Sequence, residues 1–190
     1  VGSEMCIRDR PASTKYHGAY KKGLVEHSYK VYEILKGKIE YHKLEVSEDT
    51  LAIITLLHDL CKVNFYKVDY RNAKNARGEW EKVPYYAVED TIPYGHGEKS
   101  VMMITEYMKL TNEEKYAIRW HMGFTEPKEL YGTIGEAYKK YPIALLTKYP
   151  TQSTSLTFSF ILSPTVIPYR FIWNKPVSYT HLTLPTILLV

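Results

Sequence analysis

The sequence contains little cysteine, and this excludes one class of protein. Cys6 and Cys61 are the two cysteines among 190 residues. Because Cys61 falls on a predicted buried helix, the pair gives no disulfide framework of the kind found in small secreted domains. No segment has the pattern of a signal peptide either, so we expect a reducing, cytoplasmic setting.

Acidic residues are absent from the last part of the sequence. Glu136 is the final one of 21 Asp and Glu residues. This acid-free segment raises the formal net charge of the whole chain to +4. The weakly basic balance is therefore no indication of nucleic-acid binding.

Long uninterrupted hydrophobic runs are also missing. The most apolar stretch, residues 158–173, is short and contains two prolines and Arg170. A transmembrane helix needs about 20 predominantly apolar residues. We therefore expect no membrane-spanning segment and no membrane partner.

The two ends of the chain share an inverted DNA element. Residues 5–9 can be encoded by ATG TGT ATA AGA GAC, and the reverse complement of that string encodes residues 177–181. The element resembles a transposon end used in preparing sequencing libraries. We therefore interpret residues 1–10 as an artefactual leader and residues 177–190 as translated adapter, and exclude both from the functional interpretation.

The segment before the adapter, residues 147–176, is doubtful as well. It shows no clear helical period, and four prolines would break any long helix: Pro150, Pro164, Pro168 and Pro176. A frameshift near Thr147 explains this composition, and a genuine irregular tail would explain it too. We favour the frameshift, and expect one domain at residues 11–146 followed by a doubtful tail at residues 147–190.

Within residues 11–146 the hydrophobic pattern predicts an all-α fold. Apolar residues recur at three- and four-residue steps in segments that we place at residues 23–35, 48–62, 96–108, 112–121 and 135–146. Gly37 is expected to end the first helix, whereas Ser47 and Thr111 have the sequence context of N-caps. The last helix is expected to bend at Pro142.

One β-hairpin is predicted inside this helical domain. Residues 65–72 and 79–88 have strand-like composition, and a turn sequence lies between them. We therefore place an inserted hairpin at about residues 65–88 and expect it to border the functional site, because it follows Lys62 directly. Its aromatic and basic side chains suit a pleated surface more than base stacking.

Four histidines and one aspartate carry the chemistry of this sequence: His27, His58, Asp59, His96 and His121. Imidazole nitrogen and carboxylate oxygen together suit a divalent transition metal. Neighbours on a helix lie about 100° apart, so the adjacent His-Asp pair can reach one helix edge and share an ion. A single such histidine is usually a core residue, and only the joint pattern indicates a metal site.

These residues resemble the motifs of the HD-domain metal-dependent phosphohydrolases. The resemblance covers about residues 17–146 and rests on four segments: Gly23-Leu24-Val25-Glu26-His27-Ser28, Leu56-Leu57-His58-Asp59-Leu60-Cys61-Lys62, Tyr94-Gly95-His96-Gly97 and Arg119-Trp120-His121-Met122-Gly123. It implies an HD-domain helical bundle that hydrolyses phosphoesters.

The resemblance also implies a set of metal ligands. His27, His58 and Asp59 would hold a first ion, and Asp59 would bridge to a second ion held by His96 and His121. One or two ions of Mn, Fe, Co, Ni or Zn would be bound. A pair of such ions would activate water and hold the phosphoryl oxygens.

Asp59 and Lys62 are accordingly the expected catalytic residues. Lys62 lies three residues after Asp59, near the same helix edge, where it could contact a phosphate of the substrate. A solvated lysine that favours the helix C-terminal dipole explains it equally well. His17, ahead of the first helix, is a second candidate substrate contact.

The sequence departs from the family pattern at two positions. That pattern closes with an aspartate that ligates the first ion, and it should follow shortly after residues 144–146, but no acid follows Glu136. The loss of a ligand weakens metal binding and activity. Cys61 stands where glycine is common in the family, and we expect this small residue to be tolerated.

We therefore predict a cytoplasmic metal-dependent phosphohydrolase that acts on a nucleotide or another small phosphoester, impaired in this chain by the missing aspartate. Two alternatives stay open. One is a non-catalytic HD module that binds a nucleotide or a partner, and the other is a nuclease that trims single-stranded RNA at its 3′ end. The sequence indicates no oligomeric state.

Overall fold

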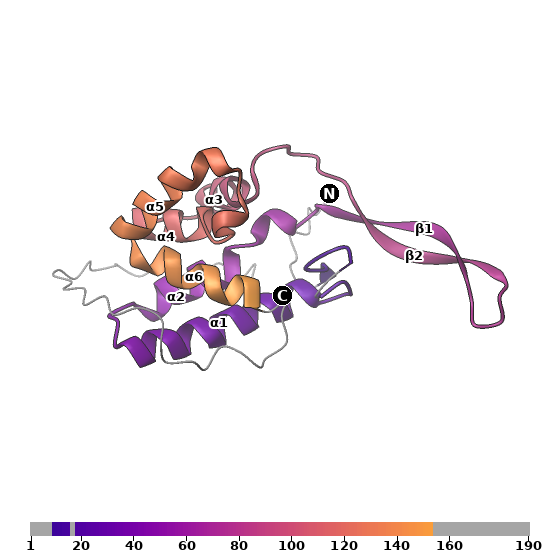
Figure 1. Cartoon of the computed structure of the whole chain (residues 1–190), viewed down its shortest axis with the longest axis horizontal. Coiled ribbons are helices and arrows are strands. Elements are labelled where there is room, and N and C mark those ends of the chain that lie inside the picture. Colours follow the sequence, from indigo (N-terminus) through magenta and orange to yellow (C-terminus); the bar gives the residue numbers. More distant parts are fainter. Residues whose placement is uncertain (1–8, 16–17, 154–190) are drawn as a thin grey trace.

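The computed structural model describes residues 9–15 and 18–153, which form a helical bundle from which one β-hairpin projects (Figure 1). The elements follow in this order: α1 (Gly23–His42), α2 (Glu48–Leu57), η2 (Leu60–Lys62), β1 (Tyr66–Lys74), β2 (Trp80–Val88), α3 (His96–Thr105), α4 (Asn112–Arg119), η3 (Gly123–Thr125), η4 (Lys128–Leu130), α5 (Tyr131–Lys140) and α6 (Pro142–Ser153). The predicted all-α bundle with one inserted hairpin is confirmed.

Helix α2 is the central element of the bundle, because its side chains enter two hydrophobic clusters. Leu51 and Ile54 belong to the larger cluster, which α1, α4, α5 and α6 complete. Ile53 and Leu57 belong to a second cluster with residues of α3 and α4. A helix that is apolar on most sides is buried, so the last turn of α2 lies in the interior of the bundle.

The predicted helix at residues 48–62 is divided in two. Ser47 caps α2, since its hydroxyl accepts a hydrogen bond from the Thr50 amide at 3.0 Å. The α-helix ends at Leu57, because Asp59 leaves the helical conformation with φ −101° and ψ 19°. The adjacent His58 and Asp59 therefore lie at a break in the helix.

The prediction that Gly37 ends the first helix is wrong. Helix α1 continues to His42 and ends at Lys43, which adopts the left-handed conformation with φ 52°. Glycine costs a helix interior about 1 kcal/mol, but Leu35 and Ile39 on either side of Gly37 are buried in the core. Their burial offsets that cost.

The predicted last helix, residues 135–146, is two helices. Tyr141 ends α5, because its backbone leaves the helical conformation with φ −132° and ψ 83°. Pro142 then begins α6 at the helix position where proline is favoured. Helix α6 continues past residue 146 to Ser153 and includes Pro150. The frameshift origin of residues 147–176 stays a prediction, and their part beyond Ser153 lies outside the described residues.

The hairpin pairs two strands of equal length in antiparallel register, from Tyr66 opposite Val88 to Lys74 opposite Trp80. Gly78, with φ 80°, makes the turn. The predicted hairpin is confirmed, with strands whose ends differ from the predicted ones by at most two residues. Most of the ribbon is exposed and extends away from the bundle (Figure 1).

Within residues 9–15 and 18–153, no helix is both long enough and apolar enough to cross a membrane. The apolar stretch at residues 158–173 lies outside this part of the chain.

Glu114 is a buried carboxylate that joins α4 to α2, and its removal is predicted to destabilise the fold. It accepts hydrogen bonds from the Thr50 hydroxyl at 2.9 Å and from the Thr111 amide at 2.8 Å. Glu114→Ala leaves both donors without this acceptor, so we expect the free energy of unfolding to fall by about 2–3 kcal/mol. Urea denaturation measures the loss. The neighbouring Glu113→Ala is the control, and equal losses for the two variants would contradict the assignment.

Candidate metal centre

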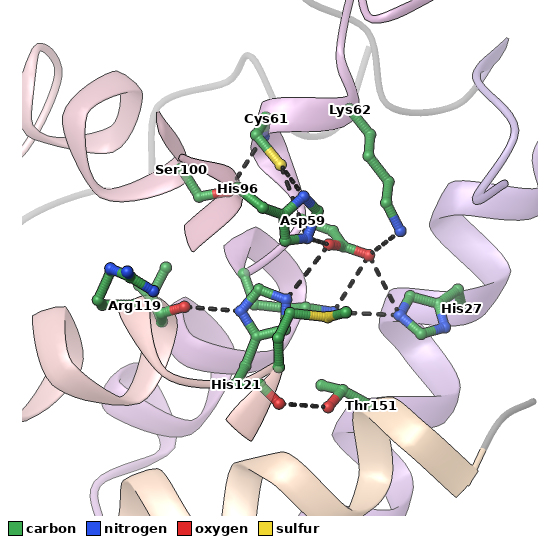
Figure 2. Close-up of polar contacts among 12 residues, drawn as sticks. His27, Asp59, Cys61, Lys62, His96, Ser100, Arg119, His121 and Thr151 are labelled. Carbon is green, nitrogen blue, oxygen red and sulfur yellow. Dashed lines mark hydrogen bonds and ion pairs between the residues drawn. The ribbon is translucent and has the colours of Figure 1, made fainter. Parts of the chain in front are cut away.

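Four histidine side chains surround one carboxylate, that of Asp59, and Figure 2 labels three of them, His27, His96 and His121. The five residues come from the second turn of α1, the end of α2, the break after it, the first position of α3 and the segment after α4: His27, His58, Asp59, His96 and His121. The sequence places these residues far apart, and the bundle brings all five together.

One side of the carboxylate forms a small triangle of potential ligand atoms. The Nε2 atoms of His27 and His58 are 3.1 Å apart. They lie 3.3 Å and 3.4 Å from Oδ2 of Asp59. A point about 2.0–2.2 Å from all three atoms, the usual distance of a transition metal from its ligands, lies just outside the plane of such a triangle. The residues predicted to hold the first ion therefore fit one.

Backbone carbonyls set the tautomers of two of these histidines. The Nδ1 of His58 lies 2.8 Å from the Thr55 carbonyl, and the Nδ1 of His121 lies 2.6 Å from the Ile118 carbonyl. A carbonyl oxygen only accepts hydrogen bonds, so both Nδ1 atoms carry a proton and both Nε2 atoms are turned toward Asp59. Metal-binding histidines are commonly held in this way.

The other side of the carboxylate faces His96 and His121. Oδ1 of Asp59 lies 2.9 Å from Nε2 of His96 and 3.5 Å from Nε2 of His121. Helices α3 and α4 approach each other so closely here that a Cβ at Gly97 would collide with the Arg119 carbonyl. The two oxygens of Asp59 thus face two separate sets of nitrogens, as a carboxylate that bridges two ions does.

A cysteine also reaches this second side, which the sequence did not lead us to expect. The Sγ of Cys61 lies 3.2 Å from Nδ1 of His96. Asp59, Cys61 and His96 form a second group whose ligand atoms lie within 4.8 Å of one another. Its only signal in the sequence is that the thiol falls two residues after the His-Asp pair.

The charge of Asp59 is balanced by neighbouring cations. Burial tends to raise the pKa of this carboxyl, but Lys62 and the surrounding histidines hold it well below its usual value. Lys62 donates a hydrogen bond to Oδ2 at 2.7 Å. Burial tends to lower the pKa of His96, yet the hydrogen bonds and charges of Asp59 and Cys61 raise it to about 10. Lys62 and a protonated His96 therefore neutralise Asp59 when no ion is bound.

Other predicted site residues differ in how far the structure supports them. Lys62 lies at the site, with its side chain 14% exposed. His17 lies outside the described residues. The hairpin borders the site only at its base, where Tyr66 is near enough for the charges of Lys62 and Asp59 to affect its pKa.

Helix α6 brings threonines to the region where the resemblance places an aspartate. Thr147 and Thr151 are buried and lie one turn apart. The hydroxyl of Thr151 is 3.0 Å from the His121 carbonyl (Figure 2). Within the described residues, α6 presents no acidic side chain to the site.

The fold and the cluster define this protein as a helical domain with a buried group of residues around one aspartate that could hold a metal ion. Residues 24–150 match the family model described as HD domain, and the chain belongs to that family. Its members are generally metal-dependent hydrolases. Comparison with curated proteins and with solved structures gave no match.

The metal-free protein is predicted to be most stable near pH 6.5, because its histidines titrate in opposite directions. Burial lowers the pKa of His27 and His121 to about 4. Between pH 6.5 and pH 4 the unfolded chain therefore binds more protons than the folded chain. The free energy of unfolding consequently falls as the pH drops through this range. The raised pKa of His96, about 10, gives stability that is lost as the pH rises from 6.5 to 10.

Urea unfolding in the presence of a chelator measures this profile. His96→Asn should remove the alkaline loss that His96 causes and keep the acid loss that comes from His27. If the parent chain and His96→Asn lost the same amount of stability above pH 6.5, the assigned pairing of His96 with Asp59 would be contradicted.

Proposed function

We propose that this protein is a cytoplasmic metal-dependent phosphohydrolase that cleaves a nucleotide or another small phosphoester. One observation carries the proposal: two imidazole nitrogens and one carboxylate oxygen lie within 3.4 Å of one another in the protein interior. His27, His58 and Asp59 would hold an ion of Mn, Fe, Co, Ni or Zn there. Membership of the HD domain family supports the same chemistry.

A bound divalent ion lowers the pKa of a coordinated water and stabilises charge on phosphoryl oxygens. The chain itself supplies the contacts around that chemistry. His27, His58 and His121 are buried, whereas the side chains of His96 and Lys62 are 31% and 14% exposed. Substrate would therefore approach from the side of His96 and Lys62.

Lys62 has a specific role in this proposal. Its ammonium group neutralises Asp59 in the metal-free site. An ion on Oδ2 would take over that neutralisation and leave the ammonium group available to a phosphate oxygen. The residue would then bind and orient substrate, as the sequence suggested.

A non-catalytic HD module is the second candidate. The threonines on α6 favour it, because the first ion would then have three protein ligands and no second carboxylate. Such a module would bind a nucleotide without turning it over. A single-stranded RNA nuclease has no observation in its favour, and a steep fall of activity with salt on oligonucleotides would identify it.

Asp59→Asn is predicted to abolish hydrolysis. The amide cannot balance the charge of an ion, so we expect the rate on a nitrophenyl phosphoester with added Mn²⁺ to fall at least about 100-fold. Asp49→Asn, which changes an exposed carboxylate on α2, is the matched control and should keep the parent rate. Equal rates for the parent chain and Asp59→Asn would exclude the proposed reaction. Metal binding without turnover by the parent chain would favour the non-catalytic module.

Thr151→Asp is predicted to strengthen metal binding, because it places a carboxylate beside His121. We expect the Kd for Mn²⁺ to fall at least about tenfold. A buried carboxylate without a cation is costly, so the metal-free variant should unfold at a lower temperature and regain stability with Mn²⁺. Isothermal titration calorimetry measures the Kd, and differential scanning calorimetry measures the unfolding temperature. Thr133→Asp, on the exposed face of α5, is the control, and equal affinities for the two variants would contradict the prediction.

A further inference from the structure

The outer edge of β1 is a row of backbone groups that no strand in the described part of the chain covers. Within residues 9–15 and 18–153, β1 pairs with β2 alone. The ribbon projects from the bundle, and most of its side chains are exposed (Figure 1). A two-stranded ribbon is at best marginally stable by itself, and an open edge of this kind is a template for another strand.

The register of the hairpin identifies the residues whose backbone faces outward. The Asn75 amide donates a hydrogen bond to the Glu79 carbonyl directly opposite, and the Glu89 amide donates to the Phe65 carbonyl, both at 2.9 Å. Hydrogen-bonded and non-hydrogen-bonded pairs alternate along an antiparallel ladder. The outward backbone groups of β1 therefore belong to its even-numbered residues: Tyr66, Val68, Tyr70, Asn72 and Lys74.

The two edges of the ribbon differ in one residue. Pro84 lies opposite Tyr70 in the middle of β2, at an outward-facing position. Because proline has no N–H group, a ladder along the outer edge of β2 is interrupted there. The nine residues of β1 include no proline. Of the two edges, that of β1 is therefore the one that can accept a strand along its whole length.

We propose that this edge pairs with β1 of a second copy of the chain, so that two hairpins form one antiparallel four-stranded sheet. The twofold axis would pass beside Tyr70, which would lie opposite the partner's Tyr70, as in any isologous contact. Tyr66 would lie opposite the partner's Lys74, so β1 would pair from its first residue to its last. The dimer requires neither a metal ion nor hydrolysis.

Charge complementarity favours a second copy in this register. With Tyr70 at the axis, Asp69 lies opposite the partner's Arg71, and Arg71 lies opposite the partner's Asp69. Both pairs fall at non-hydrogen-bonded positions of the new ladder, where opposite side chains are closest. The smallest shift that keeps outward groups facing each other is two residues. Such a shift would place two Asp69 carboxylates or two Arg71 side chains opposite each other, which is unfavourable.

Protection of an exposed edge does not account for this pattern. Charged side chains often protect an edge strand, and charges of one sign do so best because they repel a second copy. The exposed residues Lys67, Asp69 and Arg71 alternate in sign instead. The outward Tyr70 amide donates to the Asp69 carboxylate at 2.8 Å. In the dimer it would donate to the partner's Tyr70 carbonyl, and the carboxylate would turn to the partner's Arg71.

Sedimentation equilibrium of the full chain tests the proposal, and we expect the parent chain to form a dimer. Asp69→Arg and Arg71→Asp each place like charges opposite each other, so each should raise the Kd of the dimer at least about tenfold. An equimolar mixture of the two variants should recover the parent Kd, because every pair in the mixed dimer has opposite charges. Glu81→Arg, which reverses an exposed carboxylate on β2, is the matched control and should keep the parent Kd.

Asn72→Pro tests the backbone pairing without a change of charge. The Asn72 amide faces outward, so proline removes a donor from the interface and leaves the ladder with β2 intact. We expect a monomer with the circular dichroism of the parent chain. A monomeric parent chain, a dimer that persists in both Arg71→Asp and Asn72→Pro, or a mixture of the charge variants that stays monomeric would each overturn the proposal. These outcomes leave the proposed function standing, since that function is measured at the metal centre.

Discussion

The buried charge of Asp59 is the constraint on which the rest of the structure depends. A carboxylate that is 3% exposed cannot stay ionised without compensation. Lys62 and His96 provide that compensation in the metal-free state. The Nε2 atoms of the other three histidines, His27, His58 and His121, lie within 3.5 Å of the carboxylate oxygens. Under the proposed function, metal ions would take over this compensation from Lys62 and His96.

The fold keeps this arrangement in place through the burial of α2. Its apolar side chains enter two clusters at once, so the helix cannot rotate without loss of both. The break after Leu57 then fixes where the carboxylate emerges. The close contact between Gly97 and the Arg119 carbonyl sets the distance from α3 to α4, and with it the distance between His96 and His121. Stability and site geometry share the same contacts.

Local patterns in the sequence were sufficient for the bundle and the hairpin, whereas the convergence of the five polar residues was expected from their joint pattern and from the resemblance. The caps at Ser47 and Thr111 act within one turn, and strand pairing follows a short turn, so both could be predicted. The continuation of α1 through Gly37 could not be predicted, because it depends on the packing of Leu35 and Ile39 against helices that are distant in the sequence. The position of the Cys61 thiol likewise depends on how η2 packs against α3. The ligand roles themselves stay a prediction.

Charge balance also limits how an ion would be held between His27, His58 and Asp59. Where the resemblance led us to expect a carboxylate on α6, threonine leaves that ion with one negative ligand, Asp59. The neutral imidazoles of His27 and His58 would supply the remaining protein ligands. Such an ion would therefore be held weakly, and the position would be filled only at higher metal concentration, where it would complete the proposed hydrolytic centre.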